Sequence, residues 1–196
     1  RILRLKFRLG LFDDPYGLVG NYEKFACPEY VNSAYRAAVE GEVLLKNENS
    51  ILPLSKDTRI LLVGPNANSM RTLGGGWNYS WQGDQAENPK YTGQYNTIYE
   101  ALKSKFKNVE YLPVLNYASH AHFETEERGD FSKAVRAARN ADVIVAAIGE
   151  NSYCETVGNI NDISLSQNQR DLVKELARTG KPIVLVLNEG RPRVLN

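Results

Sequence analysis

Short apolar runs alternate with amphipathic segments over most of the chain. The runs RILLVG, VEYLPV, ADVIVAAIG and PIVLVLN predict strands at residues 59–64, 109–114, 141–149 and 182–188. Apolar positions at helical spacing predict helices at residues 96–106, 131–140 and 166–178. Nearly all-apolar strands that alternate with helices are typical of a parallel sheet covered on both faces. The pattern therefore predicts an α/β fold, a three-layer sandwich with a mostly parallel sheet.

Polar residues at the starts of these helices support the assignment. Thr97 with Glu100, and Ser166 with Gln169, have the spacing of a capping box. Asp130 directly precedes the helix at 131–140 and is a suitable N-cap. The chain ends at GRPRVLN, where a further helix is expected, so we expect the sandwich to be incomplete at its C-terminus.

The first part of the chain lacks this alternation. Residues 1–12 have apolar spacing compatible with a helix that breaks near Gly10, and turn-forming residues follow it. A second helix is predicted from Val31 to Leu45. Because the chain begins with Arg1 rather than Met, we expect it to be an excised or processed piece of a longer protein.

Composition narrows the classes of function. The net charge of +1 among 196 residues provides no field that would attract nucleic acid or an anionic membrane. A run of about 18 apolar residues, as a membrane span requires, is missing from the sequence. Cys27 and Cys154 do not make a disulfide framework, and no spacing suggests a zinc site. His120 and His122 lie in a polar stretch that favours a solvated loop over a metal site.

Three segments leave the carboxyl ends of predicted strands: residues 64–96, 149–166 and 188–191. Parallel strands place all three at one edge of the sheet, where open α/β sheets bind their ligands. The first segment is long and shows no obvious regular structure, which is typical of a functional or a disordered loop. Its two tryptophans argue against disorder. We therefore look for the functional site at this edge.

The first of these loops contains GGGWNYSWQGDQ. The indoles of Trp77 and Trp81 are suited to stack on a pyranose ring, and Gln82 and Asp84 provide groups that bind hydroxyls. The alternative is that both tryptophans pack the loop onto its own domain. The sequence leaves these two interpretations open.

The second loop carries two glutamates. Small or uncharged residues flank Glu155, so burial would raise its pKa as a general acid requires. Glu150 directly follows a strand and is better placed to orient a neighbour. In the third segment, Arg191 is suited to pair with a carboxylate and bridge loops, and Glu189 is expected to be solvated. Simple solvation is the competing interpretation for each glutamate.

Several motifs in a fixed order carry a resemblance that covers essentially the whole chain. They are KFRLGLFDDPY, LLKNENSILPL, VGPNA, GGWNYSWQG, AIGENSYCETVGNINDISLSQNQRDLV and TGKPIVLVLNEGRP. With these motifs the chain resembles glycoside hydrolase family 3, of the β-glucosidase and exo-glucanase type. In that family a (β/α)8 barrel precedes an α/β sandwich domain, and the active site lies between them. The resemblance implies the end of the barrel at residues 1–16, a linker at 17–32 and a partial sandwich domain at 33–196.

The resemblance also implies roles for single residues. Glu155 corresponds to the family's general acid/base, with Glu150 and Arg191 as supporting residues. Trp77 and Trp81 correspond to the subsite of the leaving sugar. The nucleophilic Asp belongs to the barrel, so the resemblance implies that this chain alone is inactive.

The resemblance further implies the biological setting. The expected substrate is an oligosaccharide or β-glucoside, the expected partner is the missing barrel domain, and no cofactor or metal is expected. The expected compartment is the periplasm or the exterior. Two other classes remain: a non-catalytic carbohydrate-binding module built on Trp77 and Trp81, and a flavodoxin-like nucleotide binder. The absence of a glycine fingerprint counts against the nucleotide binder.

Overall fold

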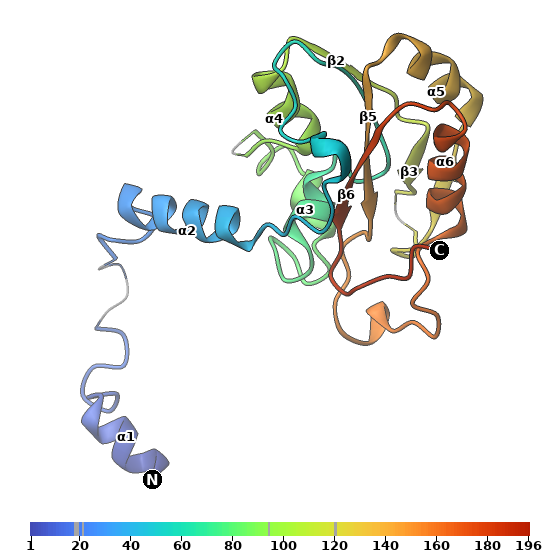
Figure 1. The fold of residues 1–196 in the computed structure, drawn as a ribbon. Helices are drawn as coiled ribbons and strands as arrows, with labels where there is room; N and C mark the ends of the chain where they lie inside the picture. The colour runs from blue at the N-terminus through green and yellow to red at the C-terminus, as the bar shows by residue number, and fades with distance from the viewer. Residues whose placement is uncertain (18–19, 21, 94, 120) are drawn as a thin grey trace. The chain divides into compact units, whose positions relative to one another are not determined.

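The computed structural model describes residues 1–196 with the exception of 18, 19, 21, 94 and 120 (Figure 1). The chain divides into two units, residues 1–53 and residues 54–196. Each unit is described by itself.

The first unit contains α1 (Ile2–Arg8) and α2 (Pro28–Gly41). The prediction of a helix that breaks near Gly10 is confirmed, because Gly10 follows α1 with a φ of 67°. The second predicted helix is confirmed with shifted ends. It begins at Pro28, whose ring sets a helical φ at the first position, and ends at Gly41 because Glu42 is extended. Three residues of the predicted linker, 18, 19 and 21, lie outside the described residues.

The second unit is built on a parallel sheet. Its strands are β1 (Arg59–Val63), β2 (Asn108–Tyr111), β5 (Val143–Gly149) and β6 (Ile183–Asn188), in the order β2-β1-β5-β6. All three neighbouring pairs are parallel. All seven residues of β5 are buried, as an inner strand covered on both faces requires. The predicted α/β fold with a mostly parallel sheet is confirmed.

Helices cover both faces of this sheet. Helix α4 (Ile98–Lys105) lies on one face, while α5 (Phe131–Ala137) and α6 (Gln167–Ala177) lie together on the other (Figure 1). The main core lies between the sheet and the α5–α6 pair. Its buried side chains include Leu61, Val63, Val114, Leu115, Phe131, Ile144, Ile148, Leu165, Leu172 and Leu176.

The predicted helix caps are confirmed in two cases and half confirmed in the third. Thr97 and Glu100 form the reciprocal capping box of α4. Asp130 accepts a hydrogen bond from the Ser132 N–H at the start of α5. Ser166 caps α6 by accepting from the Gln169 N–H, but the Gln169 side chain does not return the bond. It points into the protein instead.

The sequence pattern missed some short elements. Strands β3 (Leu115–Tyr117) and β4 (Glu126–Arg128) form an antiparallel pair in a sheet of their own. Helix α3 (Met70–Gly74) and a 3₁₀ turn (Asp84–Glu87) lie in the loop that was expected to have no regular structure. Elements this short contain too few positions to establish a period.

Candidate functional site

The carboxyl ends of β1, β5 and β6 meet at one edge of the sheet, as the sequence predicts. The fully buried amide of Asn66 lies among them and donates to the carbonyls of Glu150 (3.0 Å) and Asn188 (3.4 Å). Gly149 has a φ of 143°, and a Cβ there would lie 2.0 Å from the Asn188 oxygen. Only glycine therefore allows β5 and β6 to approach this closely where the site begins.

Hydrogen bonds join the loop after β1 to the loop after β5. The Gln82 side chain accepts from the Cys154 N–H at 2.9 Å and donates to the Cys154 oxygen at 3.0 Å. The Ser152 hydroxyl donates to the Gln82 carbonyl at 2.6 Å. Both amide atoms of Gln82, which the sequence predicts as a hydroxyl-binding group, bind this backbone. Since Gln82 follows Trp81 and Cys154 precedes Glu155, the paired bonds bring the predicted platform and the predicted acid to one place.

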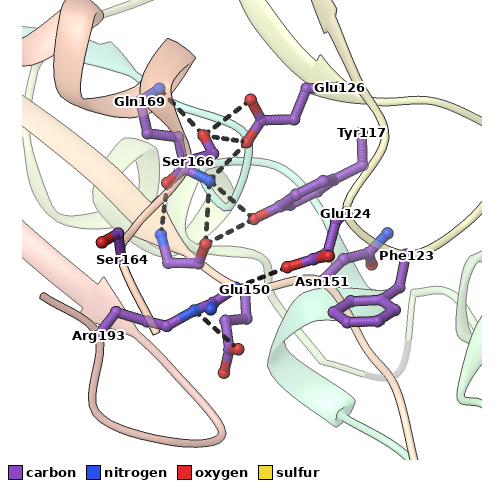
Figure 2. Close-up of a pocket in the computed structure, with 11 residues that line it drawn as sticks. Tyr117, Phe123, Glu124, Glu126, Glu150, Asn151, Ser164, Ser166, Gln169 and Arg193 are labelled. Carbon is purple, nitrogen blue, oxygen red and sulfur yellow. Dashed lines mark hydrogen bonds and ion pairs between the residues drawn. The ribbon is translucent and has the colours of Figure 1, made fainter. Parts of the chain in front are cut away.

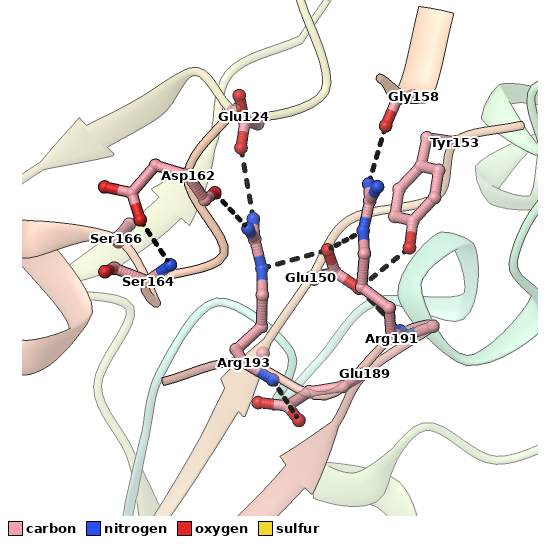
Figure 3. A network of polar contacts seen from close by, with 12 residues as sticks. Glu124, Glu150, Tyr153, Gly158, Asp162, Ser164, Ser166, Glu189, Arg191 and Arg193 are labelled. Carbon is pink, nitrogen blue, oxygen red and sulfur yellow. Dashed lines mark hydrogen bonds and ion pairs between the residues drawn. The ribbon is translucent and has the colours of Figure 1, made fainter. Parts of the chain in front are cut away.

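Glu150 is a buried carboxylate with several partners (Figure 3). It accepts from the N–H groups of Gly190 (2.9 Å) and Arg191 (3.1 Å) and from the Tyr153 hydroxyl (3.0 Å). Its Oε1 also lies 3.1 Å from Arg191 Nε and 3.0 Å from Arg193 Nε. Two guanidinium groups thus compensate the charge of a side chain that is only 2% exposed. This geometry is suited to holding loops together.

Arg191 and Arg193 also contact the loop after β5. Arg191 Nη2 donates to the Gly158 carbonyl at 2.7 Å, and its guanidinium lies 4.1 Å from the centre of the Tyr153 ring. Burial raises the pKa of Tyr153, so its hydroxyl remains a donor to Glu150. Arg193 Nη1 donates to the Asp162 carbonyl at 3.2 Å. The loop after β5 is therefore held on two sides by residues that follow β6.

Glu155 differs from Glu150 in its environment. It is exposed, and it begins the 3₁₀ turn Glu155–Gly158 with a φ of 54°. The expected burial of Glu155 by its neighbours is wrong, because Thr156 and Val157 are exposed as well. Cys154 is buried beneath the turn, and burial raises the pKa of its thiol, which does not favour a nucleophile.

The two tryptophans face outward. Trp77 is 72% exposed and Trp81 is 45% exposed. The backbone N–H of Trp77 donates to the backbone carbonyl of Trp81 at 2.8 Å, which closes a tight turn between them. The alternative in which they pack the loop onto its own domain is wrong for Trp77, and about half of the Trp81 side chain is covered. Asp84 is engaged nearby, because the Ser80 hydroxyl donates to it at 2.6 Å and lowers its pKa.

Two cavities open at this edge. The larger, of about 320 Å³, lies between the ends of the three loops, with walls from Thr72, Leu73, Gly75, Gly76, Glu150–Tyr153 and Asn188–Gly190. Glu189 is half-buried there and burial raises its pKa, so the expectation of simple solvation is wrong. The smaller, of about 50 Å³, lies between Tyr117, Glu126, Gln169 and Arg193 (Figure 2). It is large enough to hold water and polar enough to bind it.

The part of the chain that the structure describes contains neither a metal cluster nor a membrane-spanning helix. Outside residues 18, 19, 21, 94 and 120, no cluster of three or more His, Cys, Asp and Glu side chains is arranged to hold a metal ion. His120, one of the histidines considered above, lies outside the described residues. Among the described helices, none has both the length and the apolar character needed to cross a bilayer.

A parallel α/β sandwich with a site built from loops at its carboxyl edge defines a broad class of ligand-binding and catalytic domains. Comparison with known proteins makes the class specific. Residues 42–196 match the glycosyl hydrolase family 3 C-terminal domain. The chain belongs to glycosyl hydrolase family 3.

The relatives are glycosidases. The chain is 37% identical to the lysosomal beta glucosidase of Dictyostelium discoideum over 205 residues, which cover 100% of this chain and 24% of that protein. It is 34% identical to the periplasmic beta-glucosidase of Salmonella typhimurium, over 99% of this chain and 27% of that protein. The crystal structure of beta-glucosidase from Listeria innocua superposes with a TM-score of 0.76 and 34% identity, over 98% of this chain and 25% of that one. The chain thus spans about a quarter of the length of these relatives.

Proposed function

We propose that this chain is the acid/base-bearing part of a retaining β-glucosidase-like hydrolase, which removes β-linked glucosyl residues from oligosaccharides or glucosides. The observation that carries the proposal is the contrast between the two glutamates of one loop. Glu150 is buried between two arginines, whereas Glu155 is exposed at the same edge of the sheet. A proton donor must reach substrate, and of this pair only Glu155 is accessible.

The rest of the site would come from a preceding barrel. In this proposal residues 1–16 end that barrel, residues 17–32 link it to the sandwich, and residues 33–196 belong to the sandwich domain. A barrel Asp attacks the anomeric carbon while Glu155 protonates the departing oxygen. Glu155 then deprotonates the water that hydrolyses the glycosyl-enzyme, with the two carboxylates about 5–5.5 Å apart.

The exposure of Glu155 implies that the proposed barrel, besides providing the nucleophile, helps to bury this carboxylate. A general acid needs a raised pKa, and burial is the usual cause of such a shift. Its own neighbours in this chain leave Glu155 exposed. The substrate and the barrel would therefore bury it when the site is assembled, while Trp77 and Trp81 stack on the leaving sugar. Without the barrel nucleophile, this chain alone would be inactive.

The test is Glu155→Gln in the hydrolase that contains this chain. Turnover of alkyl glucosides with poor leaving groups should fall strongly, because their departing oxygen needs a proton. The first step with aryl glucosides that carry good leaving groups should fall much less. Glu127→Gln, which changes an exposed glutamate of β4, is the control and should leave both rates unchanged. Equal losses on both kinds of substrate would assign the acid/base role to another residue.

The second candidate is a non-catalytic carbohydrate-binding module, and the exposure of Trp77 and Trp81 is the observation that favours it. Titration of the chain with glucosides, followed by tryptophan fluorescence, separates the two. Saturable binding by the chain alone supports the module. Unchanged tryptophan fluorescence at millimolar glucoside supports the proposal that this chain provides only part of an active site. We further propose a periplasmic or extracellular location, as in the periplasmic relative.

A further inference from the structure

We propose that Arg193 is a positioning residue, which fixes the loop bearing Glu155 by tying the far end of that loop to the buried carboxylate of Glu150. The inference rests on the proposed function, since it concerns the placement of the proposed acid. Arg193 lies beyond the segments that the sequence pattern marks as functional.

Gln82 and Arg191 attach the loop after β5 on either side of the turn that begins with Glu155. Gln82 binds both backbone groups of Cys154, directly before Glu155. Arg191 donates to the carbonyl of Gly158, at the end of the 3₁₀ turn. These contacts define the turn itself, but they leave the following residues unattached.

Arg193 supplies the missing attachment. Its Nη1 donates to the Asp162 carbonyl at 3.2 Å, while Nε lies 3.0 Å from Glu150 Oε1 (Figure 3). Its Nη2 donates to Glu124 Oε1 at 3.1 Å, on the connection between β3 and β4. The Val194 N–H next to it donates to the Ile163 carbonyl at 3.0 Å. One side chain therefore joins the end of β5, the acid-bearing loop and the β3–β4 connection.

The side chain is suited to this task by its shape. Nη1 and Nη2 donate hydrogen bonds in fixed directions to two partners, Nε forms an ion pair with Glu150, and only 6% of the side chain is exposed. The rigid guanidinium fork holds these directions, whereas the compact ammonium of lysine has no such geometry. Replacement by lysine would keep the charge beside Glu150 and lose the directed contacts to Asp162 and Glu124.

The fold does not depend on Arg193 alone. Without it, Glu150 keeps Arg191, the Tyr153 hydroxyl and two backbone N–H donors. The charge of Glu150 would still be compensated. We therefore expect a variant at Arg193 to fold and to differ chiefly in how firmly the loop is held.

The first measurement follows the loop directly in the 196-residue chain. Hydrogen exchange of the hydrogen-bonded amides of Asn159, Ser164 and Leu165 should become at least about tenfold faster in Arg193→Lys, while the amides of β5 keep their wild-type rates. Arg128→Lys, which changes an exposed ion pair with Asp171, is the matched control and should leave the loop unchanged. Unchanged exchange in Arg193→Lys would overturn the proposal.

The second measurement is kinetic and uses the hydrolase that contains this chain. In Arg193→Lys, kcat for a poor leaving group should fall about 10- to 100-fold with KM nearly unchanged, because a displaced acid transfers its proton slowly. The rate with a good leaving group should fall much less. Equal losses on both substrates would contradict positioning. If Glu155→Gln shows the expected selectivity and Arg193→Lys does not, only the role of Arg193 fails.

A second variant covers the case in which Arg193→Lys does not fold. Glu124→Gln weakens one contact of Arg193 at an exposed position, so the fold should persist. It should show the same two effects with smaller magnitude: faster amide exchange in the loop, and a lower kcat for substrates with poor leaving groups only. Wild-type exchange and kinetics in Glu124→Gln would then overturn the proposal.

Discussion

Glu150 and Glu155 belong to one loop and have opposite surroundings. Glu150 is buried beside Arg191 and Arg193, and Glu155 is exposed on the following turn. The sequence predicts Glu150 as a supporting residue and Glu155 as the proton donor, and both roles stay predictions. Arg193 could not be predicted, because its partners at Glu124 and Asp162 are distant in sequence and meet only in the fold.

We expect Glu150→Gln to destabilise the chain by about 3–5 kcal/mol, because it removes the buried charge beside Arg191 and Arg193 and leaves Arg193 only the more exposed carboxylate of Glu124. Urea denaturation of the wild type and the variant measures the difference. Asp57→Asn is the control: it breaks an exposed ion pair with Lys107 and should cost no more than about 1 kcal/mol. A loss of similar size in both variants would show that the Glu150 cluster contributes no more than a surface pair.

Helix α6 holds the end of β5 in place through one buried side chain. Gln169 Oε1 accepts from the Gly149 N–H at 2.8 Å, and Nε2 donates to the Gly149 carbonyl at 3.0 Å. The Tyr117 hydroxyl donates to the same carbonyl at 2.9 Å, and burial raises the pKa of Tyr117. The sequence predicts Gln169 in a capping box, because the spacing from Ser166 is correct. It cannot show that the side chain turns inward to a strand.

Gln169→Leu should therefore lower the free energy of unfolding by about 1–3 kcal/mol, since it leaves the buried Gly149 N–H without a partner while the Gly149 carbonyl keeps the Tyr117 hydroxyl. Gln167→Leu makes the same change on the exposed side of α6 and should stay within about 0.5 kcal/mol. Thermal or urea denaturation distinguishes them. Equal effects would mean that Gln169 acts only through helix propensity.

The first residue of β1, Arg59, and the residue directly before β5, Asp142, form a pair that should respond to acid. Hydrogen bonds from the Arg59 side chain and backbone lower the pKa of Asp142 to about 2. Because this folded value is below the ordinary 3.8, the pair stabilises fully above pH 3.8 and loses its effect as the pH falls through about 2. The stability difference between the wild type and Asp142→Asn should shrink over that interval. A difference that stays constant down to pH 2 would contradict the assignment.

The short β3–β4 pair shows where pattern analysis fails among the elements. Its strands have three residues each, and Glu126, Glu127 and Arg128 of β4 show no apolar alternation. The pair is held by the tertiary structure, through Tyr117 at Gly149 and Glu126 at Ser166. The parallel strands were predictable because their apolar runs reflect burial on both faces.

The position of the site follows from the topology of the whole molecule. Parallel strands must place the segments after β1, β5 and β6 at one edge, so the sequence could predict which loops meet. It could not predict the bonds between them, such as those of Gln82 to Cys154. Those depend on loop conformations that include positive φ at Trp77 and Glu155, which side chains of that size rarely adopt.

The two units of the chain should also differ in their contribution to folding. Every residue of the main core belongs to residues 54–196, and none of the described residues in 1–53 is buried. Residues 1–53 instead expose large apolar side chains: Ile2, Leu3, Leu5, Phe7, Leu9, Leu11, Phe12, Tyr16, Tyr22, Phe25, Tyr30, Val31, Tyr35, Val39, Val43, Leu44 and Leu45. Exposed apolar surface on this scale favours association.

A chain of residues 54–196 should therefore keep the urea midpoint of the 196-residue chain, because it retains the whole core. Sedimentation velocity should show the 196-residue chain self-associating with rising concentration and the shorter chain remaining monomeric. Replacing Leu3 and Phe7 of α1 by serine should reduce association without changing the midpoint, since neither side chain is part of the core. If the shorter chain lost its cooperative transition, residues 1–53 would have to contribute packing that the fold of residues 54–196 does not require. If it kept the transition and still associated, the attractive surface would lie on the sandwich domain itself, among the exposed aromatics of the loop after β1.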